Sequence, residues 1–285
     1  MEFLVLGCNG MAGHMVSLYL KSKGYNVTGF ARKPSPYVPT IVGDAVDFSF
    51  LKEIVEKHTF DAVINCVGIL NQFAEQDHPQ AILLNSYLPH YLAAVTNKLS
   101  TQIVHISTDC VFSGEQGGYT ELSFPDGKSF YDRTKALGEL NDGKNVTLRT
   151  SIVGPDLKPS GIGLMNWFLQ QKGTVSGFSG ALWTGQTTLQ LAKTIEAAVL
   201  DHAHRLYNAV PDHNISKYEL LKLFNKYIRN NPIEIKKADK FIADKTLVRT
   251  RWDDFDYKIP DYETMVRELG IWMKEHKRMY PQYDL

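Results

Sequence analysis

Cysteine is scarce in this chain of 285 residues: there are three, Cys8, Cys66 and Cys110, and they lie far apart. They form no CxxC pair, so neither a disulfide framework nor a cysteine-based metal site is indicated. The nine histidines show no HxxxH or Cys–His spacing. The HxH pair, His202 and His204, stands between a predicted helix and a predicted strand, which is more typical of a solvated turn than of a metal site. No metal is expected.

The chain also lacks an excess of charge, since Lys plus Arg and Asp plus Glu both number 31. No net charge therefore favours nucleic acid or an anionic membrane as a partner. No apolar stretch approaches the ~20 residues that a membrane-spanning helix needs, and the first residues show no charged leader with a cleavage site. Hydrophobic residues make up 44% of the chain, enough for a folded core. We expect a cytoplasmic protein without nucleic-acid or membrane partners.

Short apolar runs alternate with amphipathic stretches through the first half of the chain. Strands are predicted over 3–6, 25–30, 62–66, 102–106 and 146–148, and helices over 11–23, 81–98 and 131–140. This alternation predicts an α/β fold with a doubly wound parallel sheet, covered by helices on both faces. Beyond residue 155 the pattern is mixed: helices are predicted over 164–171, 189–200 and 216–228, and a strand over 205–210 that rejoins the first sheet.

A glycine-rich turn joins the first predicted strand to the first predicted helix. It reads Gly7-Cys8-Asn9-Gly10-Met11-Ala12-Gly13. Glycine at such a turn lets backbone N–H groups approach a pyrophosphate, and the helix dipole stabilises its negative charge. Glycine turns are common, but this one stands between a strand and a helix at the start of the chain. That position indicates a dinucleotide site.

The second predicted strand ends without the acidic residue that normally binds the ribose 2′-hydroxyl. The segment reads Gly29-Phe30-Ala31-Arg32-Lys33. Arg32 and Lys33 are suited to pair with the 2′-phosphate of NADP, and arginine has the better fork geometry. Two solvated surface cations are the alternative interpretation. We expect NADPH as the cofactor and leave NADH open.

Tyr131 and Lys135 stand four residues apart, which places them on one face of a helix. A phenol has an ordinary pKa of ~10, and a neighbouring ammonium together with an oxidised nicotinamide would lower it. Upstream, Ser107 and Thr108 follow a predicted strand, at the edge of the sheet where ligands bind in such folds. A hydroxyl group there is placed to bind a carbonyl oxygen that is being reduced.

Together these motifs resemble the extended short-chain dehydrogenase/reductases, most closely the dTDP-4-dehydrorhamnose reductase family. The matching positions are the glycine turn, Asp47-Phe48, Asn65, Asn85, the STDCVFSG run from Ser107 to Gly114, Tyr131 with Lys135, and Leu148-Arg149-Thr150-Ser151. The resemblance is looser in the second half, where 181–185 and Tyr207-Asn208 still match. It implies an NAD(P)-binding Rossmann domain over 1–155 and a smaller mixed α/β lobe over 156–285, mainly for substrate.

The resemblance implies a chemistry as well as a fold. The family reduces the 4-keto group of a nucleotide-linked 6-deoxysugar with a hydride from NAD(P)H, for surface polysaccharide precursors. In this chain it implies that Thr108, Tyr131 and Lys135 are catalytic. Tyr131 would supply the proton, while Lys135 would tune Tyr131 and hold the nicotinamide ribose.

The resemblance also implies which residues contact each ligand. For the cofactor these are, beside Arg32 and Lys33, the residues Gly7, Asn9, Gly10, Met11, Gly13, Asp47, Phe48, Cys66, Val67, Gly68, Asn85, Tyr131, Lys135 and Ser151, with Asp47 holding the adenine. For the substrate they are Thr108, Cys110, Ile152 and Trp183.

Three positions depart from the family pattern. Cys110 stands where the family usually has tyrosine, and Ile152 where it tends to have tryptophan near the sugar. Met15 replaces an acid that some members use for a magnesium-bridged dimer, so magnesium is not expected and a homodimer is left open. The first two departures keep a UDP-linked N-acetylated 4-keto-6-deoxysugar open as substrate. The alternative from another functional class is a non-catalytic NADP-binding subunit that regulates a partner protein.

Overall fold

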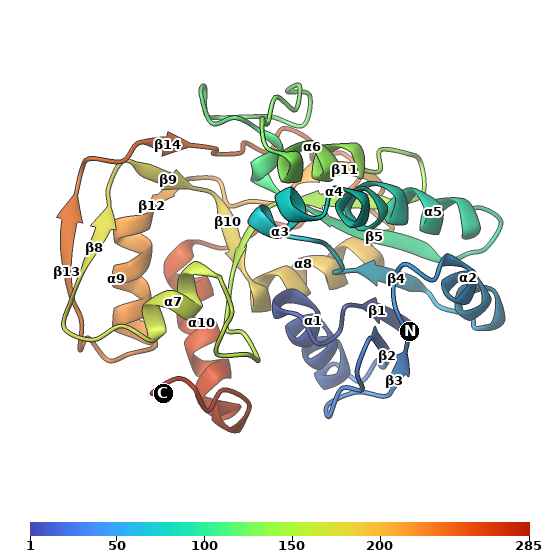
Figure 1. Ribbon diagram of the computed structural model, residues 1–285, viewed down its shortest axis with the longest axis horizontal. Helices are drawn as coiled ribbons and strands as arrows, with labels where there is room; N and C mark the ends of the chain where they lie inside the picture. The colour runs from blue at the N-terminus through green and yellow to red at the C-terminus, as the bar shows by residue number, and fades with distance from the viewer.

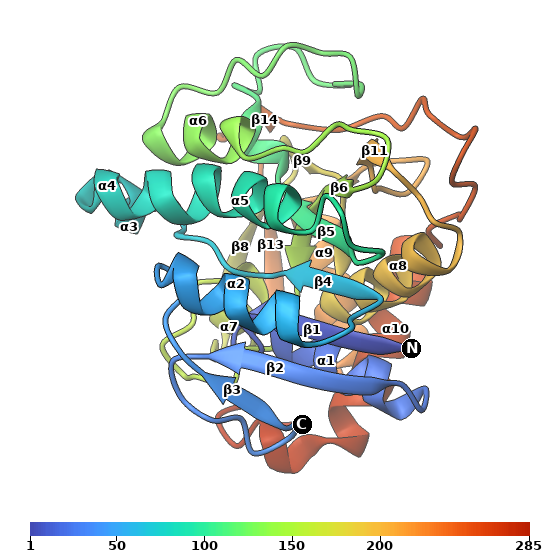
Figure 2. The same cartoon turned by 90° about the vertical axis from the view of Figure 1, so that its right-hand side faces the viewer.

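A seven-stranded parallel sheet forms the centre of the molecule. The computed structural model describes all residues, Met1–Leu285, and orders the strands β3-β2-β1-β4-β5-β6-β11 (Figures 1 and 2). Their bounds are β1 Glu2–Leu6, β2 Asn26–Ala31, β3 Thr40–Val42, β4 Ala62–Asn65, β5 Gln102–Ser107, β6 Val146–Arg149 and β11 Arg205–Asn208. The strand order reverses between β1 and β4, as in a doubly wound sheet. The predicted fold class is confirmed.

Helices cover both faces of this sheet because its strands are buried on both sides. Along β1, Phe3 and Val5 pack into the core beside helix α1 (Met11–Ser22) and helix α8 (Thr188–Leu200). The alternate residues Leu4 and Leu6 belong to a second core. Helices α2 (Phe48–Lys57) and α5 (Leu88–Val95) cover that opposite face (Figure 2).

Apart from α8 and β11, the residues beyond β6 form a second region beside the sheet, on the left in Figure 1. It holds three small sheets, β7 with β10, β12-β9-β14, and β8 with β13. The elements are β7 Ser151–Val153, α7 Leu164–Leu169, β8 Thr174–Phe178, β9 Ala181–Trp183, β10 Gly185–Thr187, β12 Ile215–Ser216, α9 Lys217–Tyr227, β13 Glu234–Ala238, β14 Ala243–Asp244, α10 Tyr262–Glu275 and the 3-10 turn η3 Lys277–Met279. Strand β11 returns to the large sheet and pairs with β6, as predicted. The division of the chain at residue 155 into a cofactor domain and a substrate lobe stays a prediction.

Two helices of the structure have other bounds than predicted, and both carry predicted site residues. The predicted helix 131–140 is α6, Phe130–Leu137, and it ends before Gly138. A Cβ at Gly138 would lie 1.9 Å from the carbonyl oxygen of Asn85, so this glycine permits close packing of two segments. The predicted helix 81–98 is divided into α4 (His78–Ala81), a π-helical turn η1 (Ile82–Tyr87) and α5. The short helix α3 (Asn71–Gln76) precedes them, and none of the helices is long and apolar enough to cross a membrane.

Candidate active site

The glycine turn lies at the carboxyl end of β1, where the strand order reverses. Gly7 has a φ of +77°, a conformation that favours glycine, and its N–H donates to the carbonyl oxygen of Phe30 at 2.8 Å. A Cβ at Gly13 would lie 2.2 Å from the carbonyl oxygen of Gly7, so only glycine lets α1 start this close to the strand. Cys66, Val67 and Gly68 follow β4 on the other side of the reversal. This crevice is where such sheets bind dinucleotides.

The residues that directly follow β2 lie beside the glycine turn. The side-chain amide of Asn9 donates to the carbonyl oxygen of Lys33 at 2.8 Å, which ties the glycine turn to β2. Arg32 and Lys33 are both exposed there. The exposed Asp47 caps α2, with its carboxylate accepting from the N–H of Phe50 at 3.0 Å. Contact of Asp47 with adenine stays a prediction.

The predicted catalytic residues come from β5 and α6. Thr108 directly follows β5, and its hydroxyl donates to Asp109 at 3.1 Å and accepts from the N–H of Cys110 at 3.1 Å. These bonds start the 3-10 turn η2, Asp109–Val111. Tyr131 and Lys135 lie on α6, whose start is fixed by a capping box in which Ser129 and Asp132 exchange hydrogen bonds. Tyr131 and Lys135 are almost completely buried.

Burial dominates the acid–base behaviour of this pair. It raises the pKa of Tyr131 well above its ordinary value, and the Thr108 hydroxyl, by hydrogen bonding, opposes this rise. Burial also lowers the pKa of Lys135 to about 8, with Glu139 and Cys66 opposing. The Lys135 ammonium donates to the carbonyl oxygen of Ile106 at 2.8 Å. The phenol of Tyr131 is therefore held protonated here, and a lowering of its pKa by Lys135 together with an oxidised nicotinamide stays a prediction.

A buried ion pair, missed in the sequence, lies beside Ser107 at the end of β5. The guanidinium of Arg149 donates twice to the carboxylate of Glu139, at 2.6 and 2.9 Å, and stacks over Phe112 at 4.9 Å from its ring centre. Ser107 donates to the same carboxylate at 2.7 Å. The network therefore ties the ends of β5 and β6 to the segment after α6. No spacing in the sequence indicated this pair, because Glu139 lies beyond the end of α6 and Arg149 lies on β6.

Asn85 supports the site from inside the π-helical turn. Its side-chain oxygen accepts from the backbone N–H of Ile69 at 2.8 Å. Its side-chain nitrogen donates to the carbonyl oxygen of Ile69 at 3.0 Å and to the hydroxyl of Thr134 at 3.1 Å. The side chain is fully buried. In this structure Asn85 therefore positions the loop after β4 against α6, and direct contact with a cofactor stays a prediction.

The four predicted substrate residues are placed differently from one another. Cys110 packs beside Tyr131 in a small apolar cluster with Ala74 and Ala81, and burial raises the pKa of its thiol to about 12. The thiol is therefore protonated and packed in this cluster, and its contact with a substrate stays a prediction. Ile152 is half-buried on β7 directly after Ser151. Trp183 is only 6% exposed and packs on Tyr262, so it presents little free surface to a sugar.

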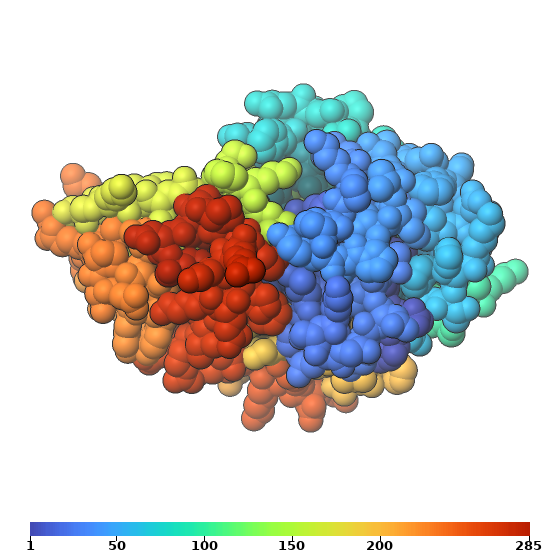
Figure 3. Space-filling view, turned by 90° about the horizontal axis from the view of Figure 1, so that it is seen from below, coloured from blue at the N-terminus to red at the C-terminus, as the bar shows by residue number.

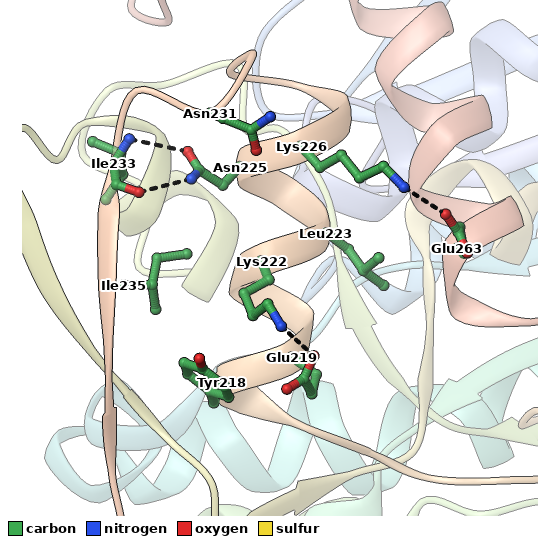
Figure 4. Close-up of a pocket in the computed structure, with 10 residues that line it drawn as sticks. All are labelled: Tyr218, Glu219, Lys222, Leu223, Asn225, Lys226, Asn231, Ile233, Ile235 and Glu263. Carbon is green, nitrogen blue, oxygen red and sulfur yellow. Dashed lines mark hydrogen bonds and ion pairs between the residues drawn. The ribbon is translucent and has the colours of Figure 1, made fainter.

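A cavity of about 480 Å³ lies elsewhere, between α9, β13 and α10. Figure 4 shows its lysines already paired, Lys222 with Glu219 and Lys226 with Glu263. None of the predicted site residues lines it. The chemistry-bearing side chains gather instead at the carboxyl ends of β1, β4 and β5.

The sequence also matches a family model, the RmlD substrate binding domain, over residues 1–240. The chain belongs to this family. The resemblance drawn from the motifs is therefore confirmed, and with it a fold shared with extended short-chain dehydrogenase/reductases.

Curated relatives match this RmlD-family chain over only part of its length. A probable low-salt glycan biosynthesis reductase of Haloferax volcanii is 32% identical over 49% of this chain and 48% of its own. A dTDP-4-keto-6-deoxy-D-glucose reductase of Streptomyces niveus is 30% identical over 48% and 46%. A methionine adenosyltransferase 2 subunit beta of Xenopus laevis is 25% identical over 54% and 48%. The chain spans about half the length of these relatives.

Solved structures match nearly the whole chain at low identity. A dTDP-4-dehydrorhamnose reductase of Bacillus anthracis in complex with NADP has a TM-score of 0.80 and 19% identity, over 95% of this chain and 99% of its own. A UDP-glucose 4-epimerase of Thermotoga maritima has a TM-score of 0.75 and 14% identity, over 97% and 100%. These structures share the fold of this RmlD-family protein.

Proposed function

We propose that this protein is an NADPH-dependent reductase of the 4-keto group of a nucleotide-linked 6-deoxysugar, of dTDP-4-dehydrorhamnose reductase type. One observation carries the proposal: a buried, protonated Tyr131 lies beside Thr108 and on the same helix as Lys135. A protein that only binds a dinucleotide has no chemical need for all three groups. We further assign 1–155 to the cofactor and 156–285 mainly to the substrate.

The residues of this chain fit a dinucleotide. The tight turn at Gly7 and the close approach at Gly13 leave the start of α1 free of side chains that would block a pyrophosphate. NADPH, when bound, supplies the hydride that is added to C4 of the sugar. Arg32 and Lys33 would hold its 2′-phosphate at the end of β2, and the B. anthracis relative in complex with NADP supports this choice.

Tyr131 performs the proton transfer in this mechanism. As C4 accepts the hydride, the electron pair of its carbonyl bond moves to the oxygen, and that oxygen takes the proton of the Tyr131 hydroxyl. The hydroxyl of Thr108, which donates to Asp109 in this structure, turns from that carboxylate to donate a hydrogen bond to the same oxygen and so stabilises the developing charge. Lys135 stabilises the phenolate that remains and holds the nicotinamide ribose. Its anchor on Ile106 sets the position of the ammonium before reaction.

The sugar is proposed to be linked to dTDP, because relatives named for dTDP-sugars recur among the matches. The half-buried Ile152 leaves an apolar wall where a bulkier substituent fits, so the UDP-linked N-acetylated sugar is the alternative substrate. Parallel assays with both 4-keto sugars, following NADPH oxidation, test the choice. A higher kcat/KM with the UDP-N-acetyl sugar would overturn it.

The likeness to methionine adenosyltransferase 2 subunit beta favours a second candidate, a non-catalytic NADP-binding regulatory subunit. The same assays distinguish the two. Tight NADPH binding without turnover of any 4-keto nucleotide sugar would support the regulatory subunit and refute the reductase.

A further inference from the structure

The C-terminal segment folds back onto the glycine turn. After η3, the side chains of Tyr280 and Tyr283 are buried in the same core as Met15 of α1. Figure 3 shows the C-terminal residues, in red, directly against the N-terminal residues, in blue. This segment lies outside residues 1–240, the range that matches the family model.

Two hydrogen bonds of His14 connect Tyr280 to the glycine turn. The ring of His14 contacts the carbonyl oxygen of Gly10 through Nδ1 at 2.9 Å and the hydroxyl of Tyr280 through Nε2 at 3.0 Å. A carbonyl oxygen only accepts, so Nδ1 carries the hydrogen. Burial lowers the pKa of His14 and keeps the ring neutral, so Nε2 accepts from Tyr280. Tyr280 therefore donates to His14, and His14 donates to Gly10. We call these two hydrogen bonds the relay.

This relay fixes the peptide that a pyrophosphate would meet. The carbonyl oxygen of Gly10 also accepts from the backbone N–H of His14 at 3.0 Å, so two donors hold it. In a trans peptide the C=O of Gly10 and the N–H of Met11 point in opposite directions. Holding the carbonyl against His14 therefore aims the Met11 N–H away from the helix, toward the turn.

The same segment also holds a loop beside Met11. Tyr283 accepts from the N–H of Asp156 at 3.0 Å and donates to Asn166 at 2.5 Å. Gln282 donates to the carbonyl oxygen of Asp156 at 2.6 Å. The loop that starts there ends at Gly163, where a Cβ would lie 3.5 Å from the sulfur of Met11.

We propose that the C-terminal segment is a positioning element of the dinucleotide site. Tyr280 acts through His14 on the Gly10–Met11 peptide, and Tyr283 with Gln282 acts on the loop beside Met11. The inference rests on the proposed function in taking NADPH as the ligand. None of these C-terminal side chains needs to touch the cofactor.

The test is NADPH affinity, measured by titration of the full chain. Tyr280→Phe leaves Nε2 of His14 without its donor and should raise the Kd for NADPH about three- to tenfold. In a His14→Leu background the same change should add nothing, because the relay is already broken. Gln282→Ala removes one bond from a partly exposed side chain, and it gives a second measurement should Tyr280→Phe fail to fold. It should raise the Kd by about twofold or more.

Tyr262→Phe is the matched control. Tyr262 is also buried, and its hydroxyl donates to the carbonyl oxygen of His213 at 2.9 Å, outside both the glycine turn and the C-terminal segment. It should lower the melting temperature without changing the Kd for NADPH. Unchanged Kd in Tyr280→Phe and Gln282→Ala, an equal loss in the control, or additive effects with His14→Leu would overturn the inference. A wild-type chain that binds no NADPH would instead refute the proposed function.

Discussion

Replacing Glu139 by glutamine tests the buried ion pair that Glu139 forms with Arg149 beside Ser107. The side chains of Arg149 and Glu139 are 2% and 7% exposed, so water cannot replace the lost charge. Removing one partner of a buried pair typically costs about 3–5 kcal/mol, because the other charge is left uncompensated. Whole domains are stable by only about 5–15 kcal/mol. Glu139→Gln should therefore lower the free energy of unfolding by about 3 kcal/mol or more.

Urea denaturation followed by circular dichroism measures this loss. Glu53→Gln is the control, since it breaks an ion pair with Lys57 in which both side chains are more than half exposed. Such a surface pair contributes less than about 1 kcal/mol. The double variant Glu139→Gln with Arg149→Met removes both buried charges and should regain most of the stability. Equal, small losses in Glu139→Gln and Glu53→Gln would refute the reasoning.

Further predictions concern catalysis and the cofactor. Tyr131→Phe should keep NADPH affinity and lower kcat by about 10²–10⁴, measured by NADPH oxidation; near-normal kcat would exclude Tyr131 as the acid. Arg32→Ala should weaken NADPH binding by about one to two decades and leave NADH binding unchanged, whereas equal loss for both would make Arg32 structural. Lys135 has a pKa of about 8 and acts as a cation, so kcat/KM should fall as pH rises through about 8, and a flat profile would contradict this. Chelators should not affect activity, because the buried Met15 offers no oxygen ligand; loss restored by Mg²⁺ would count against this.

Local patterns predicted the parts of the fold that are decided within a few residues. The strand, glycine turn and helix at the N-terminus were predicted because their apolar run and glycine spacing are contiguous. The spacing of Tyr131 and Lys135 likewise placed both on α6. Helices α2 and α10 were missed although each has a signal: Asp47 and Asp261 cap them, and apolar residues follow at helical spacing.

Contacts between distant segments were beyond such patterns. The π-helical turn around Asn85 arises where that residue meets Ile69 and Thr134, and Gly138 ends α6 because it packs on the same turn. The tyrosine that holds His14 lies 266 residues away in the sequence. No periodicity or spacing connects such pairs, because their proximity depends on how the whole chain folds.

The pKa of Tyr131 shows why the same sequence motif does not fix the chemistry. The four-residue spacing places an ammonium on the same helix face, but burial is the largest influence on the phenol, and Lys135 bonds the carbonyl oxygen of Ile106 instead. A protonated phenol is what reduction requires, since the carbonyl oxygen must receive a proton as the hydride arrives. Oxidation of an alcohol would require the phenolate. Burial keeps the phenol of Tyr131 protonated, and above a pH of about 8 a deprotonated Lys135 would no longer stabilise the phenolate that remains after proton transfer.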